Sequence, residues 1–503
     1  ASGATTKVNS LRMRRLRFAG VALARAGAPL AWDAVCRQGI NRANLVGGWT
    51  RPARQHEIQP IRTMTASSPS AAPATPQAAP SAAAGGTWAA GQLAAAIAAT
   101  DALAGERRAG VRLRLQRVLD AFAAERLGVH HFASVSGYGH GDLGREALDR
   151  VFARVLQAEA AAVRLQFVSG THAIAAALYG VLRPGDRLLA LTGRPYDTLE
   201  EVIGIRGSGQ GSLADFGIAY DELDLLPDGT VDEAGIAEAL AVPTRMVLIQ
   251  RSCGYSWRPS LRVEQIGRLV ERVKAIRPDC LVFVDNCYGE LVELQEPTAV
   301  GADLMAGSLI KNLGGTIAPT GGYVAGRADL VEQACCRLTA PGIVSEGGTG
   351  FDLHRLLFQG LFLAPQMVSE ALVCADLVAA TFSALGYPVK PAPGEPRSDV
   401  IQAVRFGDPE PLKAVCRAFQ ACSPVGSYLD PVPAPMPGYA SELVMAGGTF
   451  IDGSTSEFSA DGPLREPYVL YAQGGTHRAH AELALERALQ ALVDGGWIGS
   501  GTT

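Results

Sequence analysis

The chain has 503 residues, of which 48% are apolar, 19% are charged and 57 are glycine. This length and composition predict two or more folded units with a sizeable core and exclude a largely disordered protein. The formal net charge of -4 offers no electrostatic basis for binding nucleic acid or an anionic membrane, so we expect neither as a partner.

The first 86 residues differ in character from the rest of the chain. Residues 1–85 contain eleven Lys and Arg but only two Asp and Glu, and the segment LRMRRLRF holds four of the arginines. The following tract, ASSPSAAPATPQAAPSAAAGG, lacks the apolar residues that a core needs. We therefore expect a plastid or mitochondrial transit peptide and a disordered linker over residues 1–86; the alternative is a plain disordered extension on a cytoplasmic protein.

The remaining sequence predicts an α/β protein with two domains. Residues 87–150 read as a helical segment that joins the smaller domain, interrupted by the glycine-rich loop SVSGYGHGDLG. Short apolar strands and helices alternate over 151–385, which is typical of a large domain with a mostly parallel central sheet. The pattern changes near 386, and residues 386–503 are predicted to form a smaller α+β domain that ends in the helix THRAHAELALERALQALVDGG.

Three features of the predicted large domain carry chemistry. Ser169-Gly170-Thr171 stand where the strand VRLQFVSG meets a helix, and a helix N-terminus with a glycine can bind a phosphate through free amides. Asp285 ends the strand LVFVDN, where ligands of open α/β sheets bind. Lys311, in SLIKNLGG, is a lone amine in apolar, glycine-rich sequence. Each also has an ordinary interpretation, as a helix cap, a capping aspartate or a lysine that extends to solvent.

One cofactor explains all three features together. Pyridoxal 5'-phosphate needs a phosphate cradle, a carboxylate that keeps its ring nitrogen protonated and a lysine amine that forms a Schiff base. Competing motifs are weak: GSGQGS at 207–212 has neither a preceding strand nor a clear following helix, and no P-loop or HExxH motif occurs. The eight histidines and nine cysteines lack metal-ligand spacing, so no metal site is expected.

These motifs resemble those of the methionine gamma-lyase-related proteins that are often labelled aluminium resistance proteins. The family belongs to the fold type I pyridoxal phosphate enzymes of cysteine and methionine metabolism. The similar stretches cover most of the chain from about 130 to 495 and include SGYGHGDLGREALDRVFA, VSGTHAIAAALYGVLRPGDRLLALTGRPYDTLEEVIGI, FVDNCYGELVELQEPTAVGADLMAGSLIKNLGGTIAPTGGYVAGR, QGLFLAPQ, MPGY and SADGPLREPY.

The resemblance implies roles for the three features and for one more residue. Lys311 would bond the cofactor aldehyde, and Asp285 would pair with the pyridinium nitrogen. Ser169, Gly170 and Thr171 would contact the phosphate, joined by Ser308 three residues before the lysine.

Further roles follow from the same resemblance. Tyr196 would stack on the cofactor ring and assist the leaving group, although a turn tyrosine at the surface is the alternative. Tyr138 would reach the phosphate of a neighbouring subunit, which implies a homodimer or homotetramer with shared active sites. Arg465, in DGPLREPY, is the candidate for binding the substrate carboxylate, with a surface salt bridge as the alternative.

Two departures from the family pattern bear on the substrate. Leu313 stands where the family usually has proline after Lys-Asn, which removes a fixed φ from the turn. Cys253 stands where arginine is common, so a guanidinium near the substrate carboxylate is lost unless Arg251 or Arg258 replaces it.

The expected activity is that of a carbon-sulfur lyase acting on a sulfur-containing amino acid. Lys311 would remove the α-proton, and elimination at the β or γ carbon would expel a thiol. The same residues could also serve an aminotransferase or an aldolase-like lyase. A protein that binds the cofactor without turnover and acts in stress tolerance is a third hypothesis, from a different class.

Overall fold

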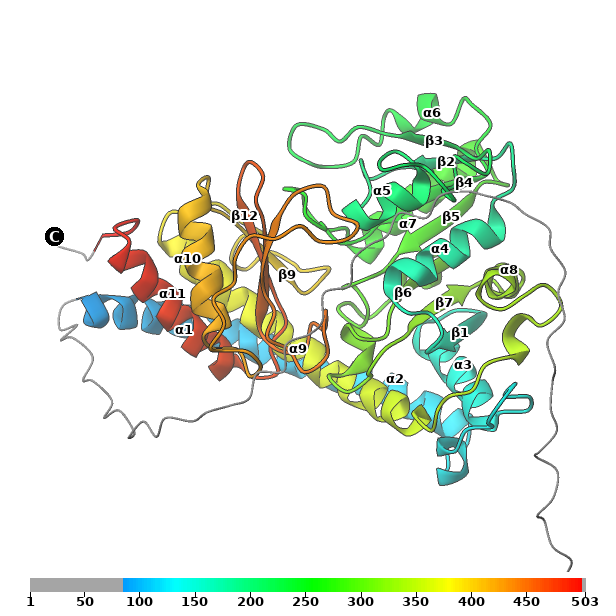
Figure 1. Ribbon diagram of the computed structural model, residues 1–503, viewed down its shortest axis with the longest axis horizontal. Coiled ribbons are helices and arrows are strands. Elements are labelled where there is room, and N and C mark those ends of the chain that lie inside the picture. Colours follow the sequence, from blue (N-terminus) through cyan, green and yellow to red (C-terminus); the bar gives the residue numbers. More distant parts are fainter. Residues whose placement is uncertain (1–84, 500–503) are drawn as a thin grey trace, which may run out of the picture. The chain divides into compact units, whose positions relative to one another are not determined.

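The computed structural model describes residues 85–499, which belong to one compact unit spanning Ala78–Thr503 (Figure 1). The predicted transit peptide and linker over 1–86 lie outside the described residues, except for Gly85 and Gly86, which begin helix α1. The prediction for that segment therefore stays a prediction.

The larger of two sheets has seven strands in the order β1-β7-β6-β5-β4-β2-β3. All neighbours are parallel except β7, which runs antiparallel to both β1 and β6. The strands are β1 (Ala160–Arg164), β2 (Arg187–Ala190), β3 (Ala219–Glu222), β4 (Met246–Gln250), β5 (Leu281–Asp285), β6 (Leu304–Ser308) and β7 (Gly322–Gly326). Because β4, β5 and β6 are parallel neighbours, their carboxyl ends meet at one edge, where Gln250, Asp285 and Ser308 stand.

Helices cover both faces of this sheet, because its central strands are apolar on both sides. In β5, Val282 and Val284 join the core under α2, α3, α7 and α9, whereas Leu281 and Phe283 join the opposite core under α4, α5 and α8. The helices are α2 (Val111–Ala124), α3 (Leu143–Val155), α4 (Gly170–Val181), α5 (Asp197–Ile203), α6 (Ile236–Ala239), α7 (Val263–Ile276) and α8 (Ala328–Leu338). Short 3-10 turns are η1 (Val129–Phe132), η2 (Pro297–Val300), η3 (Asn312–Gly314) and η4 (Val344–Glu346).

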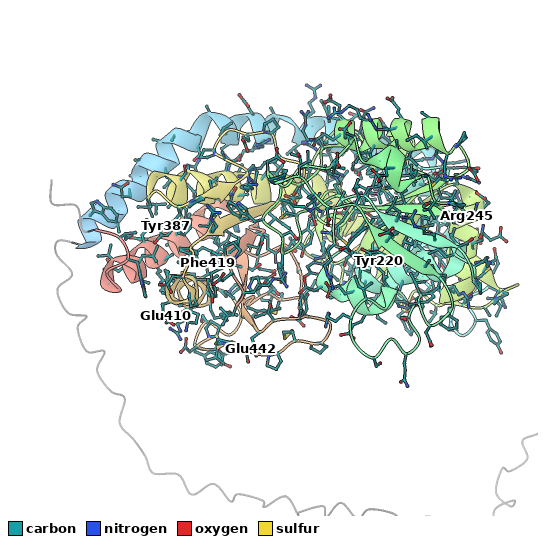
Figure 2. All side chains as sticks on the ribbon, turned by 90° about the horizontal axis from the view of Figure 1, so that it is seen from above. Tyr220, Arg245, Tyr387, Glu410, Phe419 and Glu442 are labelled. Carbon is teal, nitrogen blue, oxygen red and sulfur yellow. The ribbon has the colours of Figure 1, made fainter. Side chains whose placement is uncertain are left out.

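The second sheet is antiparallel throughout, in the order β10-β11-β12-β9-β8. Its strands are β8 (Val389–Lys390), β9 (Ile401–Arg405), β10 (Leu443–Ala446), β11 (Ser459–Pro463) and β12 (Val469–Gln473). The same part of the chain contains the helices α10 (Pro409–Gln420) and α11 (Arg478–Asp494). Phe419 of α10 is buried in its core and Tyr387 packs at the margin, while Tyr220 lies in β3 of the larger sheet (Figure 2).

Two long helices connect these parts. Helix α9 (His354–Ala384) contacts η3 and α2 near the larger sheet and β9, β12 and α11 of the smaller one, and α1 (Gly85–Ala109) packs along α9 and α11. Helix α9 is long and apolar enough to cross a membrane by composition, but 78% of its most apolar window is buried inside the molecule. That burial is typical of a core helix.

The predicted fold class is confirmed. The protein has an α/β structure with a mostly parallel seven-stranded sheet, and a smaller α+β part with an antiparallel sheet. The helix predicted over THRAHAELALERALQALVDGG is present as α11 (Arg478–Asp494).

Candidate active site

A cavity of about 220 Å³ opens at the carboxyl ends of β4, β5 and β6, between the larger sheet and strands and loops of the smaller one. Seven of the nine residues predicted from the sequence line it together: Ser169, Gly170, Thr171, Tyr196, Asp285, Ser308 and Lys311. They come from the three chain segments that carry the predicted features and, for Tyr196, from a further loop. The structure thus brings the three chemical features into one place.

The N-terminus of α4 forms one wall of the cavity. Ser169 caps the helix, and its hydroxyl accepts a hydrogen bond of 3.1 Å from the His172 amide. Within residues 85–499, the amides of Gly170 and Thr171 donate to no protein acceptor. A Cβ added to Gly170 would lie 3.1 Å from Cβ of Ser308, so glycine lets β6 approach closely here. Free amides at a positive helix end are suited to a phosphate group.

Asp285 lies on the floor of the cavity with only 7% of its surface exposed. Its Oδ1 accepts a hydrogen bond of 3.1 Å from the Cys287 amide. Burial raises the pKa of this carboxyl, and the positive charges of Lys311 and Arg258 partly oppose that shift. A buried carboxylate in this position would gain from a cationic ring nitrogen as partner.

Lys311 stands three residues after the end of β6, and its Nζ lies 3.6 Å from the centroid of the Tyr288 ring. The amide of the Asn312 side chain donates hydrogen bonds of 2.9 Å to the carbonyls of both Tyr288 and Glu290. The lysine loop is therefore tied to the loop that follows Asp285.

The turn after the lysine is packed against α9. The backbone at Gly314 and Gly315 touches Gly360, because a Cβ at Gly315 would lie 2.0 Å from the Gly360 carbonyl oxygen. Leu313 is 1% exposed and belongs to the main core. The leucine that replaces the family's proline thus anchors this turn by burial.

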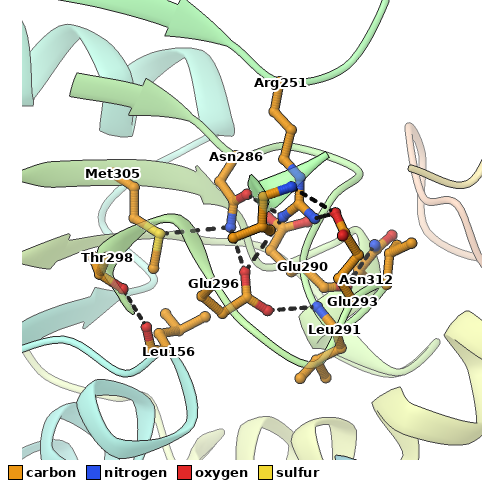
Figure 3. Close-up of polar contacts among 12 residues, drawn as sticks. Leu156, Arg251, Asn286, Glu290, Leu291, Glu293, Glu296, Thr298, Met305 and Asn312 are labelled. Carbon is orange, nitrogen blue, oxygen red and sulfur yellow. Dashed lines mark hydrogen bonds and ion pairs between the residues drawn. The ribbon is translucent and has the colours of Figure 1, made fainter. Parts of the chain in front are cut away.

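A buried polar network around Arg251 connects the loops that follow β4 and β5 (Figure 3). The Arg251 guanidinium is fully buried and donates a 2.8 Å hydrogen bond to Oδ1 of Asn286. It also forms ion pairs with Glu293 at 3.1 Å and Glu296 at 3.5 Å. Since Asn286 directly follows Asp285, this network fixes the end of β5 and positions its carboxylate.

Aromatic side chains form the upper wall. The hydroxyls of Tyr196 and Tyr439 are 2.8 Å apart, and the Tyr255 ring lies 5.3 Å from that of Tyr196 and 5.8 Å from that of Tyr439. Burial, together with the neighbouring Tyr439, raises the pKa of Tyr196 well above its usual value. Tyr196 is therefore a protonated hydroxyl at neutral pH.

Two predicted site residues do not line this cavity. Tyr138 lies in the loop before α3 and is 82% exposed. Arg465 forms a two-pronged ion pair with Asp197, at 3.0 and 3.1 Å, and its NH2 also donates to the Tyr255 carbonyl.

Arg251 and Arg258 do not take the place of a guanidinium at Cys253. Arg251 belongs to the network below the site, and Arg258 is buried with its NH2 bound to the carbonyls of Gln250 and Ser252. Among the described lining residues, the cavity has Lys311 as its single cationic side chain.

Four polar lining residues that the sequence did not single out bear on the chemistry: Tyr255, Tyr288, Tyr439 and Asp461. Tyr288 could have been found, because it stands three residues after Asp285 at the same strand end. Tyr255 could have been found in the same way, because it follows β4 by five residues. Tyr439 and Asp461 come from a loop and a strand far along the chain, and no local signal marks them. Within the described residues, no group of three or more His, Cys, Asp or Glu side chains could hold a metal ion.

Comparisons with known proteins agree on one family. Residues 94–493 match the family model described as methionine gamma-lyase. The uncharacterized protein YnbB of Bacillus subtilis (strain 168) is 47% identical over 378 residues, which cover 75% of this chain and 90% of that protein.

Solved structures with similar sequences share the architecture. A Listeria monocytogenes protein involved in aluminum resistance is 47% identical with a TM-score of 0.78, covering 80% of this chain and 100% of its own. A carbon-sulfur lyase involved in aluminum resistance from Clostridium novyi NT is 45% identical with a TM-score of 0.77, covering 80% and 96%. These matches confirm the resemblance drawn from the sequence motifs.

Proposed function

The chain belongs to the methionine gamma-lyase family and has the fold of type I pyridoxal phosphate-dependent enzymes, and we propose that it is itself a carbon-sulfur lyase. Its substrate would be a sulfur-containing amino acid, and its cofactor pyridoxal 5'-phosphate. The observation that carries the proposal is the convergence of Lys311, Asp285 and the α4 N-terminus on one cavity.

The residues present fit the cofactor. The unpaired amides of Gly170 and Thr171 and the hydroxyls of Ser169 and Ser308 suit its phosphate. The buried Asp285 carboxylate suits its ring nitrogen. When bound, pyridoxal phosphate supplies an aldehyde for amine exchange and a ring that stores the electrons of the substrate carbanion.

Lys311 has the position of the catalytic base. Its amine stands over Tyr288 and faces the cavity, so it can receive the α-proton of an amino acid held above the floor. Asp285 stabilises positive charge at the floor, and the Arg251 network keeps that carboxylate in place.

Tyr196 has the position of the acid for the leaving group. Its hydroxyl is protonated because of burial, and it bonds to the hydroxyl of Tyr439 at the cavity wall. A proton donated from Tyr196 to the departing sulfur could be replaced through the hydroxyl of Tyr439. The products would be a thiol, ammonia and a 2-oxo acid.

Two parts of the proposal concern residues outside the cavity. The exposed Tyr138 would act in a homodimer or homotetramer by reaching the phosphate site of a neighbouring subunit. Arg465 would bind the substrate carboxylate, and its partly exposed guanidinium, paired with Asp197, also contacts the carbonyl of the lining residue Tyr255.

A product screen tests the function. Purified protein would be loaded with pyridoxal phosphate and incubated with cystathionine, methionine, homocysteine and S-substituted cysteines, and thiol, ammonia and 2-oxo acid would be quantified. We expect all three products in equal amounts from wild type and none from Lys311→Ala. Amino-group transfer to an added 2-oxo acid without thiol release would favour an aminotransferase. Visible absorbance of lysine-bound cofactor without any turnover would favour a non-catalytic binder.

A further inference from the structure

A second cavity of about 460 Å³ adjoins the candidate active site on the side of the smaller sheet. The two cavities share the lining residues Met445, Gly453, Asp461 and Gln473. A substrate bound over Lys311 could therefore extend its leaving group into the second cavity.

The shared wall is one face of the antiparallel sheet. Ser459 and Asp461 are two residues apart in β11 and so point to the same side. Gln473 of β12 pairs directly with Ser459, and Met445 of β10 pairs directly with Asp461, which puts all four side chains on that face.

Asp461 presents a carboxylate oxygen to this space. The carboxyl is 6% exposed, and its Oδ2 accepts hydrogen bonds from the Tyr255 hydroxyl at 2.8 Å and from Nε2 of Gln473 at 3.3 Å. Its Oδ1 has no hydrogen-bond partner among residues 85–499. Burial raises the pKa of Asp461, and the Tyr255 bond and the charge of Lys311 oppose that shift.

In the described part of the chain, the second cavity supplies no positive charge to Asp461 besides that of Lys311 in the neighbouring active site. Among the described lining residues of the second cavity there is no Lys, Arg or His. Two more aspartates line it: Asp430, which is paired with Arg417 at 2.9 Å, and Asp452, which is exposed. Ser459 is 2% exposed, and its Oγ has no hydrogen-bond partner in the described structure. This unpartnered hydroxyl and the free Oδ1 of Asp461 lie on the same face of β11, and both can accept a hydrogen bond from a ligand.

We propose that the second cavity is a subsite for the leaving group of the substrate and selects a thiol that carries a protonated amine. The ammonium group donates to Oδ1 of Asp461 and to Oγ of Ser459, the two acceptors that the protein leaves free. This inference rests on the proposed function and specifies its substrate class: an amino acid whose sulfur bears an aminoalkyl arm, in preference to one with a short neutral alkyl group such as methionine.

Two substrates with equally long arms test the subsite. S-(2-aminoethyl)-L-cysteine ends in an ammonium group where S-propyl-L-cysteine ends in a methyl group. Each reacts with one water to give pyruvate, ammonia and the corresponding thiol, cysteamine or propanethiol, so one pyruvate assay measures both. We expect wild type to have a kcat/KM about 10-fold to 100-fold higher for the cationic substrate, as for a charge pair in a partly buried site.

Variants assign that preference to named atoms. Asp461→Asn keeps the side-chain shape but removes the charge, and it should bring the ratio of the two kcat/KM values close to one. Ser459→Ala should lower the ratio by a few-fold. Asp279→Asn is the matched control, since Asp279 is an exposed aspartate that lines neither cavity, and its ratio should equal that of wild type.

The outcomes separate this inference from the proposed function. Equal kcat/KM values in wild type, or an unchanged ratio in Asp461→Asn, overturn the subsite while the lyase stands. If wild type cleaves neither substrate, the lyase proposal for such substrates fails, and calorimetry on cofactor-loaded Lys311→Ala still decides the subsite. Tighter binding of the aminoethyl compound supports it, and equal binding of the two overturns it. The wild-type and Lys311→Ala measurements also decide the question if Asp461→Asn does not fold.

Discussion

The Nζ atom of Lys311 lies 3.6 Å from the centroid of the Tyr288 ring, so an aromatic face holds the amine at the cavity floor. Tyr288 itself has a φ of 71°, an uncommon conformation for a bulky residue, and the Asn312 side chain bonds to its carbonyl. Strained backbone that is held by its surroundings is often found at functional sites. The lysine is positioned by contacts from the loop after Asp285.

Tyr288→Leu is expected to lower kcat/KM for thiol release about 10-fold, because a buried cation-aromatic contact contributes about 1–2 kcal/mol. Tyr288→Phe keeps the ring and should stay within about threefold of wild type. Steady-state kinetics on S-substituted cysteines measure both. Equal losses in the two variants would show that the hydroxyl, rather than the ring face, is what matters.

Asp285→Asn is expected to abolish most activity and yet stabilise the cofactor-free protein. Burial raises the pKa of this carboxyl, so its charge is unfavourable until a cation binds, whereas asparagine can still accept the hydrogen bond from the Cys287 amide. We expect the unfolding temperature of the cofactor-free variant to rise by about 2 °C or more. Differential scanning calorimetry with and without pyridoxal phosphate checks this.

The difference in unfolding temperature between Asp285→Asn and wild type should reverse in sign when the cofactor is present. Wild type gains stability from the partner of Asp285, so added pyridoxal phosphate should raise its unfolding temperature more than that of Asp285→Asn. If Asp285→Asn is less stable than wild type in the absence of cofactor, the buried carboxylate of Asp285 does not destabilise the cofactor-free protein.

Sequence alone could locate the floor of the site but not its upper wall. Ser169, Asp285 and Lys311 follow buried strands, and parallel strand ends converge, so their meeting was predictable. Tyr439 and Asp461 reach the cavity only because the antiparallel sheet packs above it, which depends on long-range contacts.

Arg465 shows a related limit of sequence reasoning. The sequence left open whether its guanidinium binds a substrate carboxylate or forms a surface salt bridge, and the structure pairs it with Asp197. The partner of a long charged side chain is decided by the tertiary structure, because many geometries lie within its reach.

Glu290 is expected to make the stability of the cofactor-free protein fall as the pH rises. Burial raises its pKa from 4.5 to about 8, and its Oε2 has no partner within the described residues, while Oε1 accepts from the Tyr323 hydroxyl. The folded state therefore binds a proton that the unfolded state loses above about pH 4.5. This contribution is fully present below that pH and disappears as the pH passes 8, by at most about 1.4 kcal/mol per unit.

Glu290→Gln removes this proton and should flatten the profile. We expect the variant to gain stability relative to wild type at pH 8.5 and to differ little from it at pH 5. Urea unfolding of both cofactor-free proteins at the two pH values provides the measurement. Parallel pH profiles for wild type and variant would assign the dependence to other groups.

Gly360→Ala is expected to destabilise the protein and disturb the lysine loop, although alanine normally favours a helix. A Cβ at Gly360, inside α9, would lie 2.3 Å from the Gly314 carbonyl oxygen, so the turn three residues after Lys311 would have to move. Such overpacking costs about 1–3 kcal/mol.

The matched control is Gly91→Ala in α1, where nothing lies within 4 Å of the new Cβ and a gain of about 0.5–1 kcal/mol is expected. Urea unfolding and the visible absorbance of bound pyridoxal phosphate would be measured for both variants. If Gly360→Ala matched Gly91→Ala in stability and retained full absorbance, the close contact between α9 and the lysine turn would not be needed to hold Lys311.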